Sequence, residues 1–326
     1  MRILILGGTA FLGRQVAVEA AARGHDVTCL ARGTRPAPEG IDLVVADRDD
    51  DRGLEPVAAG SWDAVVDVTS QPGQARRAVR DLDGAHWVFV SSGNVYADFV
   101  DLEQDERSTV RTAFAGDALD DMEAYGEAKV ACEAAFRAAA GSATIVRPGL
   151  IGGPGDETGR SGYWPLRFAH PTGDDVIAPD DPDFPCAMID VRDLAAWIVL
   201  AAEQHLDGVF NATGPTTALR DVLAASAEVA GSSTPARLVS GAQLAALGIG
   251  SWMGPASLPL WIDDPGWRGF ATLDTTRARA NGLTTRPLRE TLRDALAFEE
   301  SRGGPRRAGL DDADERRVRA ALELRG

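Results

Sequence analysis

Arg2-Ile-Leu-Ile-Leu6-Gly7-Gly8-Thr9-Ala10-Phe11-Leu12-Gly13 follows the first methionine and decides the fold. The apolar run before the glycines has the composition of a buried strand, and a helical pattern begins directly after them. A strand, a glycine turn and a helix N-terminus form an anion site, because backbone N–H groups and the helix dipole face a phosphate. Gly7 permits the tight turn, Gly8 leaves room for a dinucleotide and Gly13 lets the helix pack on the strand. The stretch predicts a pyrophosphate site, and a glycine turn that only packs is the alternative.

Short apolar runs alternate with helical patterns through the first half of the chain. Strands are predicted at 2–6, 26–31, 43–46, 64–68, 87–91, 143–147 and 209–211, and helices at 12–23, 124–140, 192–203, 219–230, 287–300 and 311–324. Nearly continuous apolar strands that alternate with helices indicate a parallel sheet covered on both faces. The sequence therefore predicts an α/β fold with a doubly wound parallel sheet.

The texture of the sequence changes near residue 148. Residues 149–185 are rich in Gly, Pro and Asp and contain no long periodic element, which is typical of a functional excursion rather than a connector. We predict a dinucleotide-binding domain at 1–165, completed by about 187–232. Residues 150–186 and 233–326 are predicted to form a smaller substrate-side subdomain with C-terminal helices.

Composition excludes several classes of protein. A formal net charge of −16 and a pI near 4.7 argue against nucleic acid or an anionic membrane as partner, since both require basic patches. No run of 18 apolar residues predicts a membrane span. Three widely spaced cysteines are interpreted as reduced, mostly buried thiols of a cytoplasmic protein. Four scattered histidines have no metal-ligand spacing, so no metal is expected.

The single lysine of the chain, Lys129, stands against 32 arginines and follows Tyr125 by four residues. Side chains at i and i+4 share one face of a helix. A fixed ammonium there would favour the phenolate form of the tyrosine, which would let the phenol exchange a proton near neutral pH. Arginine bias from genome composition is the alternative explanation for a lone lysine.

Four motifs together resemble the extended short-chain dehydrogenase/reductases, a clan of epimerases, dehydratases and ketone reductases. They are the glycine loop, Ser91-Ser92-Gly93-Asn94-Val95-Tyr96, the Tyr125…Lys129 pair, and Arg147-Pro148-Gly149, in the clan's order and spacing. The resemblance covers residues 1–215 well and implies a Rossmann-type fold with a smaller, mostly C-terminal substrate-binding domain. Leu6 and Ala10 depart from the usual glycine loop, so the chain resembles a divergent branch.

The resemblance implies a catalytic set of Tyr125 as acid/base, Lys129 as its cationic partner, and Ser92 as the hydroxyl that holds the substrate oxygen. Ser91 is the rival of Ser92, since either could face a cleft at the carboxyl edge of the sheet. Residues implied at the cofactor are Gly7, Gly8, Thr9, Ala10, Phe11, Leu12, Gly13, Arg32, Arg35, Asp47, Thr69, Ser91, Lys129 and Pro148.

The end of the second strand bears on the choice of coenzyme. NAD sites usually place an acid there to hold the ribose 2′-hydroxyl, and here Ala31 occupies that position. Arg32 and Arg35 follow and could pair with a 2′-phosphate. NADP(H) is therefore favoured and NAD remains an alternative, as does a purely solvated role for Arg32. Asp47 matches the acid that meets the adenine amino group in the clan, or it is a turn residue.

The substrate side is less specific. Asn94, Arg160, Tyr163 and Trp164 are the candidate substrate residues, and aromatic rings around a cleft would suit an apolar or ring-shaped molecule. The alternative is that the tryptophans fill the core of the small domain. Leu150 stands where nucleotide-sugar enzymes of the clan carry an Asn, so the donors for a sugar diphosphate look incomplete.

Three functions are compatible with these residues. The first is an NADP(H)-dependent oxidoreductase that reduces the carbonyl, or oxidises the alcohol, of a small organic substrate by hydride transfer. The second is an NAD(P)-dependent epimerase or dehydratase acting on a sugar nucleotide. The third is a non-catalytic relative that binds nucleotide or RNA. Clan members often dimerise through the Tyr-Lys helix, and a face with Val130, Ala134 and Phe136 would permit a homodimer.

Overall fold

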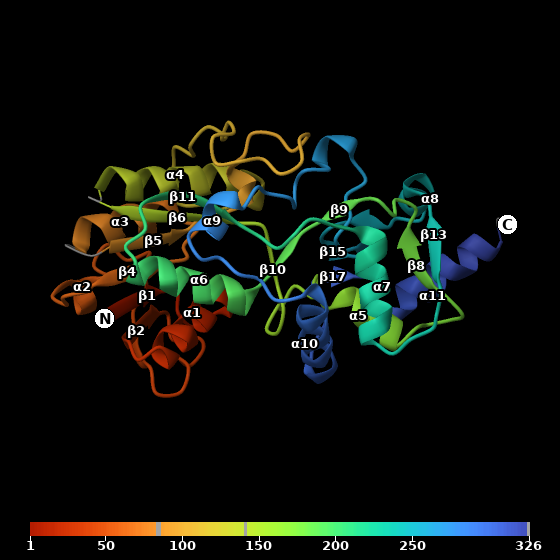
Figure 1. Ribbon diagram of the computed structural model, residues 1–326, viewed down its shortest axis with the longest axis horizontal. Helices are drawn as coiled ribbons and strands as arrows, with labels where there is room; N and C mark the ends of the chain where they lie inside the picture. The colour runs from red at the N-terminus through yellow and green to blue at the C-terminus, as the bar shows by residue number, and fades with distance from the viewer. Residues whose placement is uncertain (83–85, 140–141, 325–326) are drawn as a thin grey trace.

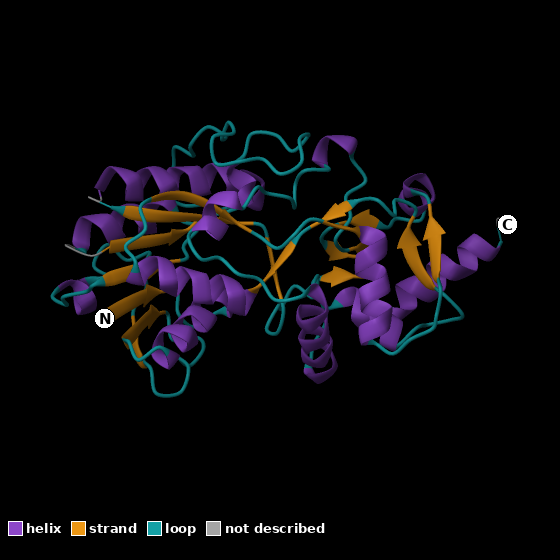
Figure 2. Cartoon of the chain, viewed as in Figure 1, coloured by secondary structure: helices purple, strands orange, loops and turns teal. Residues whose placement is uncertain are grey.

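The chain forms two lobes that lie side by side along the long axis of the molecule (Figure 1). The computed structural model describes residues 1–82, 86–139 and 142–324. The first lobe is a sheet with helices on both faces, and the second is a smaller mixture of helices and two-stranded ribbons (Figure 2). No helix in these described ranges is long and apolar enough to cross a bilayer.

Seven parallel strands make the central sheet in the order β11-β6-β5-β4-β1-β2-β3. Their bounds are β1 Arg2–Leu6, β2 Asp26–Ala31, β3 Asp42–Val45, β4 Ala64–Asp67, β5 His86–Val90, β6 Ala143–Pro148 and β11 Gly208–Ala212. The order reverses between β1 and β4, and in such a sheet the crevice at the carboxyl ends of the strands is the place where ligands bind. The α/β, Rossmann-type fold class is confirmed.

Helices cover both faces of the sheet because the inner strands carry apolar side chains on both sides. On one face lie α1 Phe11–Ala22 and α6 Val191–Glu203, which contact each other. On the other lie α2 Glu55–Ala58, α3 Pro72–Asp81 and α4 Tyr125–Ala139. Strands β4 and β5 are buried along their whole length, as expected for central strands of a doubly wound sheet.

The predicted elements of this lobe agree with the structure to within one or two residues. The last residue of the predicted helix 124–140 lies outside the described part of the chain. Helix α3 was missed because its buried side consists of small residues, Ala75 and Ala78 after Pro72 and Gly73, while arginines dominate its composition. The polar and apolar residues do alternate with helical periodicity, but the buried side chains are too small to suggest a helix that faces the core.

The second lobe has its own apolar core, and its elements come mostly from the later part of the chain. They are β7 Leu150–Gly152, α5 Tyr163–Ala169, β8 Val176–Pro179, β9 Pro185–Cys186, β10 Met188–Asp190, β12 Thr217–Ala218, α7 Leu219–Val229, β13 Ala236–Val239, α8 Gly241–Ala246, β14 Gly250–Ser251, β15 Gly254–Pro255, β16 Ser257–Leu258, α10 Leu288–Ser301, β17 Ala308–Gly309 and α11 Asp312–Glu323. Helix α9 Thr276–Ala280 returns to the sheet lobe, where Ala278 packs in the core (Figure 1). Strand β10 and α9 adjoin the sheet lobe, through α6 and β11. The predicted domain limits stay a prediction, although α7 packs in the second core rather than with the sheet.

The apolar face expected for dimerisation of α4 is smaller than predicted. Phe136 is fully buried, with its ring 5.0 Å from that of Trp87 and 4.7 Å from that of Phe89. It therefore anchors α4 to the sheet and does not belong to an outer face. Ala134 is exposed and Val130 is half-buried, so the homodimer stays a prediction with less apolar surface behind it.

His86 gives the sheet lobe a pH-dependent stability. It lies buried at the start of β5, 3.0 Å from the Thr144 hydroxyl and stacked 5.0 Å from His205. Burial, reinforced by the charge of His205, lowers the pKa of His86 from 6.5 to about 4. The unfolded chain takes up this proton first, so the stabilisation is complete above about pH 6.5 and is lost as pH falls toward 4, at up to about 1.4 kcal/mol per pH unit.

We expect His86→Gln to flatten the acid limb of the stability curve, measured as the urea midpoint between pH 7 and 4. The matched change at exposed His170 should leave that limb unaltered. Identical acid limbs for His86→Gln and the unmodified protein would contradict the assignment.

Candidate functional site

The glycine loop is shaped by contacts that leave no room for side chains. Gly7 has a φ of +96°, which favours glycine, and a Cβ at Gly13 would lie 2.2 Å from the carbonyl oxygen of Gly7. A Cβ at Gly8 would lie 2.3 Å from Sγ of Cys29 on β2. Gly8 is thus required by the packing of the loop on β2, whereas its expected role was to leave room for a dinucleotide.

The N-terminus of α1 fits a pyrophosphate. Ala10 occupies the N-cap position, and no side chain caps the helix or places an acid in its first turn. The N–H groups of the first turn are therefore open to an anionic ligand, beside the helix dipole. Thr9, Leu12 and Gly13 are buried in the loop and Ala10 is exposed. These features fit the phosphates of a dinucleotide held at the loop 7–13.

The two arginines beyond β2 differ in their contacts. Arg35 pairs with Glu157 through both carboxylate oxygens, at 2.7 and 3.0 Å. Arg32 is exposed and has no hydrogen bond or ion pair with any residue that the structure describes. Asp47 is also exposed, and its carboxylate accepts the N–H of Asp49 in a turn. Arg32 is therefore the cation at this edge that remains available to a 2′-phosphate.

Lys129 lies at the carboxyl edge of the sheet, where two backbone carbonyl groups bind its ammonium. Its Nζ donates to the carbonyl oxygens of Thr69 and Val90, both at 2.7 Å, beyond the end of β4 and at the end of β5. The side chain is 2% exposed. Nζ lies 5.0 Å from the ring centre of Phe89 and 5.8 Å from that of Tyr125. The predicted neighbourhood of phenol and ammonium is therefore present, at the carboxyl edge of the sheet.

Tyr125 begins α4 and is half-buried. The first turn of α4 lies against the 3₁₀ turn Gly93–Val95, and a Cβ at Gly126 would be 2.3 Å from the carbonyl oxygen of Asn94. Asn94 is half-buried, and its N–H donates to Oγ of Ser92 at 3.1 Å. Because Gly126 has no side chain, Tyr125 and Ser92 come from segments in direct contact.

The hydroxyl groups of Ser91 and Ser92 have different hydrogen-bond partners. Ser91 is 3% exposed and donates to Glu133 at 2.6 Å, so its hydroxyl is engaged. The oxygen of Ser92 accepts a backbone N–H, which leaves its proton free for another acceptor. Ser92 is thus the hydroxyl that can serve a substrate oxygen. Pro148, the other expected cofactor neighbour here, is buried at the end of β6 and pairs with Ala212.

Glu133 and Arg147 form a buried ion pair that the sequence did not reveal. The guanidinium binds both carboxylate oxygens, at 2.9 and 2.7 Å, and also donates to the Tyr96 hydroxyl at 3.3 Å. Burial opposes the charge of Arg147, but Glu133 outweighs it and raises the pKa of the guanidinium. The position of Glu133, four residues after Lys129 on one helix face, was the available signal. The ion pair thus links α4, which carries Tyr125 and Lys129, to β6.

Arg160 reaches the site from the loop that follows β7. Its guanidinium lies 5.3 Å from the ring centre of Trp252, and the charge of Tyr125 acts on it. Trp252 contacts Phe270, which contacts Phe99 and Trp267, with ring centres 4.9 to 5.2 Å apart. We call Phe99, Trp252, Trp267 and Phe270 the aromatic row. Trp267 is 37% exposed, so one end of the row is open to solvent.

Tyr163 and Trp164 do not line this site. They are 1% and 0% exposed in the core of the second lobe, and the Trp164 indole donates to the carbonyl of Pro259 at 3.0 Å. Burial raises the pKa of Tyr163 to about 12. The expected substrate role of these two residues is therefore corrected: they start α5, whose inward face packs against α7 and α10.

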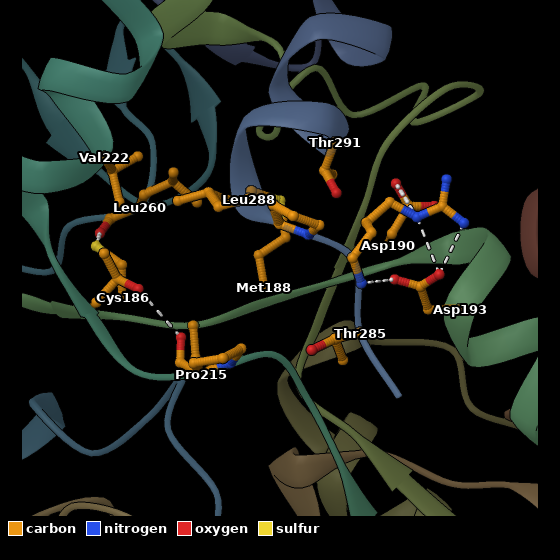
Figure 3. Close-up of a pocket in the computed structure, with 14 residues that line it drawn as sticks. Cys186, Met188, Asp190, Asp193, Pro215, Val222, Leu260, Thr285, Leu288 and Thr291 are labelled. Atoms are coloured by element: carbon orange, nitrogen blue, oxygen red, sulfur yellow. Dashed lines mark hydrogen bonds and ion pairs between the residues drawn. The ribbon is translucent and has the colours of Figure 1, made fainter. Parts of the chain in front are cut away.

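A cavity of about 350 Å³ lies between β10 and α6 on one side and α7 and α10 on the other (Figure 3). Cys186, Met188, Val222, Leu260 and Leu288 form its apolar end. At the polar end of the cavity, Arg286 donates three hydrogen bonds to the carboxylate of Asp193, so the charges of these two residues neutralise each other. Tyr125, Lys129 and Ser92 are not among its lining residues. Within the described part of the chain, no group of three His, Cys, Asp or Glu could hold a metal ion.

The three cysteines are free and buried in this structure. Burial raises the pKa of Cys29 to about 11 and those of Cys132 and Cys186 to about 12. Thiols of this kind are poor nucleophiles near neutral pH. The cysteines therefore add no reactive group to the site.

Comparison with known proteins matches the model of the NAD dependent epimerase/dehydratase family over residues 3–86 and 76–213, more than half of the chain. Among curated proteins, the photosystem II assembly factor Ycf39 of Trieres chinensis is 33% identical over 113 residues, covering 29% of this chain and 35% of that protein. The matched stretch thus spans about a third of that relative's length.

Solved structures share the fold over nearly the whole chain. The UDP-Glc/GlcNAc 4-epimerase of Campylobacter jejuni superposes with a TM-score of 0.69 at 15% identity, covering 92% of this chain and 99% of the other. The UDP-glucose 4-epimerase of Thermus thermophilus, solved in complex with NAD, gives a TM-score of 0.62 at 19% identity, with 92% and 99% covered. At these identities the likeness shows the fold.

Gly126→Ala tests the close contact below Tyr125. Alanine on an open helix would stabilise by about 0.5–1 kcal/mol relative to glycine. Here the new methyl would meet the Asn94 carbonyl, so we expect a loss of about 1–3 kcal/mol, measured as the free energy of unfolding in urea. Gly303→Ala is the matched control, because no heavy atom lies within 4 Å of a Cβ there. Equal stabilities of the two variants would contradict the proposed contact.

Proposed function

Since this chain belongs to the NAD dependent epimerase/dehydratase family, we propose that it is an NADP(H)-dependent oxidoreductase acting on the carbonyl, or the corresponding alcohol, of a small organic substrate. The observation that carries the proposal is the ammonium of Lys129 next to the Tyr125 ring at the carboxyl edge of the sheet, with Ser92 on the turn that contacts the first turn of α4. The glycine loop, with its uncapped helix, stands at the same edge.

Each of these residues would have a separate role in hydride and proton transfer. The nicotinamide, when bound, supplies or accepts the hydride. Tyr125 gives its phenolic proton to the substrate oxygen in the reductive direction, and Ser92 donates a hydrogen bond to that oxygen as negative charge develops. Lys129, fixed by the carbonyls of Thr69 and Val90, stabilises the phenolate that remains. Half-burial of Tyr125 limits the access of water to this proton.

A sugar-nucleotide epimerase or dehydratase is the second candidate, favoured by the UDP-sugar epimerases among the structural neighbours. Such a reaction consumes no net coenzyme. The cavity between the lobes speaks against a diphosphate there, because its one guanidinium, Arg286, is neutralised by Asp193. Oxidation of NADPH in proportion to product, followed by absorbance, separates the two candidates.

Tyr125→Phe should lower turnover by about 10²- to 10⁴-fold, since the variant keeps the ring and loses the proton donor. Binding of NADPH, measured by calorimetry, should stay the same. The control is Tyr163→Phe, which removes a phenol buried in the second core and should leave turnover intact. Full activity of Tyr125→Phe would refute the assigned chemistry.

Arg32→Ala tests the coenzyme preference. Loss of a charge-assisted contact to the 2′-phosphate should weaken NADPH about 10- to 100-fold and leave NADH unchanged. Arg52→Ala is the control, because Arg52 is exposed and pairs with Glu55 in its own loop. If NADPH and NADH weaken equally, or neither changes, Arg32 does not read the phosphate.

A further inference from the structure

Arg160 is an unusual cation in this protein. It is half-buried, and its only hydrogen-bond acceptor among the described residues is Oγ1 of Thr158, which takes its ε N–H at 3.2 Å. The two terminal nitrogens have no partner in the described part of the chain. Several half-buried arginines here, such as Arg192 and Arg286, are paired with carboxylates, whereas Arg237 on β13 shares with Arg160 the lack of a carboxylate partner among the described residues.

The acid of the same loop, Asp156, cannot serve as that partner. Asp156 is 3% exposed, and one carboxylate oxygen accepts the N–H and hydroxyl of Thr158 while the other accepts the N–H and hydroxyl of Ser161. These four bonds fix the loop that presents Arg160. Burial lowers the pKa of Arg160, and the charges of Asp156 and Tyr125 act in the opposite direction. A guanidinium remains charged at neutral pH, so this one has no counter-ion within the described ranges of the chain.

The surroundings of Arg160 define what could supply the counter-ion. On one side its plane lies over Trp252, the first member of the aromatic row. The exposed side chains of Met253 and Trp267 extend this apolar surface. Tyr125, the proposed proton donor, is near enough for its charge to act on the pKa of Arg160. A molecule bound beside Arg160 would meet an apolar surface and one fixed positive charge, with this phenol in the neighbourhood.

Building on the proposed function, we infer that the substrate is a planar, apolar carbonyl compound that carries one carboxylate, and that Arg160 selects it. Guanidinium and carboxylate match as planar forks with two parallel hydrogen bonds, and stacking on Trp252 holds the fork in orientation. The apolar ring would lie along the aromatic row, which favours offset or edge contacts. One guanidinium matches one negative charge, whereas a diphosphate carries more than one.

Binding of benzoate and benzamide to the NADP⁺-loaded enzyme tests this inference by calorimetry, with no need for turnover. The two probes differ in charge and share a ring. Benzoate should bind about 10- to 100-fold more tightly than benzamide, and Arg160→Gln should abolish the difference. Arg160→Lys, which keeps the charge and loses the fork, should retain part of it. Thermal unfolding verifies that each variant is folded.

Arg277→Gln is the matched control. Arg277 also stacks on an aromatic ring, 4.6 Å from the centre of Phe210, and has no ion pair with the residues that the structure describes. Arg277 belongs to α9, and its guanidinium reaches Gly208 at the start of β11, whereas Tyr125 lies at the carboxyl edge of the sheet. The preference for benzoate should persist in this variant.

Equal affinity for both probes, no binding of benzoate, or an undiminished preference in Arg160→Gln would overturn the inference. Arg160-dependent binding of UDP without binding of benzoate would overturn it in favour of a sugar nucleotide. The failure of the proposed function looks different: benzoate would bind through Arg160, yet benzoylformate and its methyl ester would both leave NADPH unoxidised. Reduction of the ester and the acid with equal kcat/KM would support the reductase and contradict the proposed requirement for a carboxylate on the substrate.

Discussion

A buried ammonium bound by two backbone carbonyl oxygens is the constraint on which the site depends. An ion of this size is costly to bury without compensation, and Lys129 receives it from Thr69 and Val90 at the carboxyl edge of the sheet. One carbonyl belongs to the last residue of β5 and the other follows the end of the neighbouring strand β4, so the sheet fixes the place of the charge. Its position next to the Tyr125 ring is therefore fixed by the fold.

Two further contacts make α4 rigid around this charge. The Glu133–Arg147 pair binds the helix to β6, and the absence of a side chain at Gly126 lets its first turn touch the turn after Ser92. Ser91 also donates to Glu133, so one carboxylate links α4, β5 and β6. Such a fully bonded buried network orients its members strongly. The proposed proton-handling residues thus rest on a frame of buried side chains that are bonded to one another.

On the proposed substrate side, the charges are compensated in a different way. Both carboxylate oxygens of Asp156 are bonded within their own loop, and this loop places Arg160 beside Trp252 with no counter-ion among the residues that the structure describes. The cavity between the lobes, by contrast, contains charges that are already balanced. The charges of Glu133, Arg147, Asp193 and Arg286 are compensated within the protein. The charge of Arg160 would be compensated by the proposed ligand.

The sequence by itself determined the sheet lobe, the glycine loop and the Tyr125–Lys129 pair, because strand burial, the turn requirement of Gly7 and the i,i+4 relation are local properties. It could not separate Ser91 from Ser92 or Arg32 from Arg35, since each pair differs only in its partners, Glu133 and Glu157, which are distant along the chain. It also placed Tyr163 and Trp164 at a cleft, where the structure buries them. An aromatic residue packs equally well in a core or against a ligand, and tertiary contacts alone decided between the two.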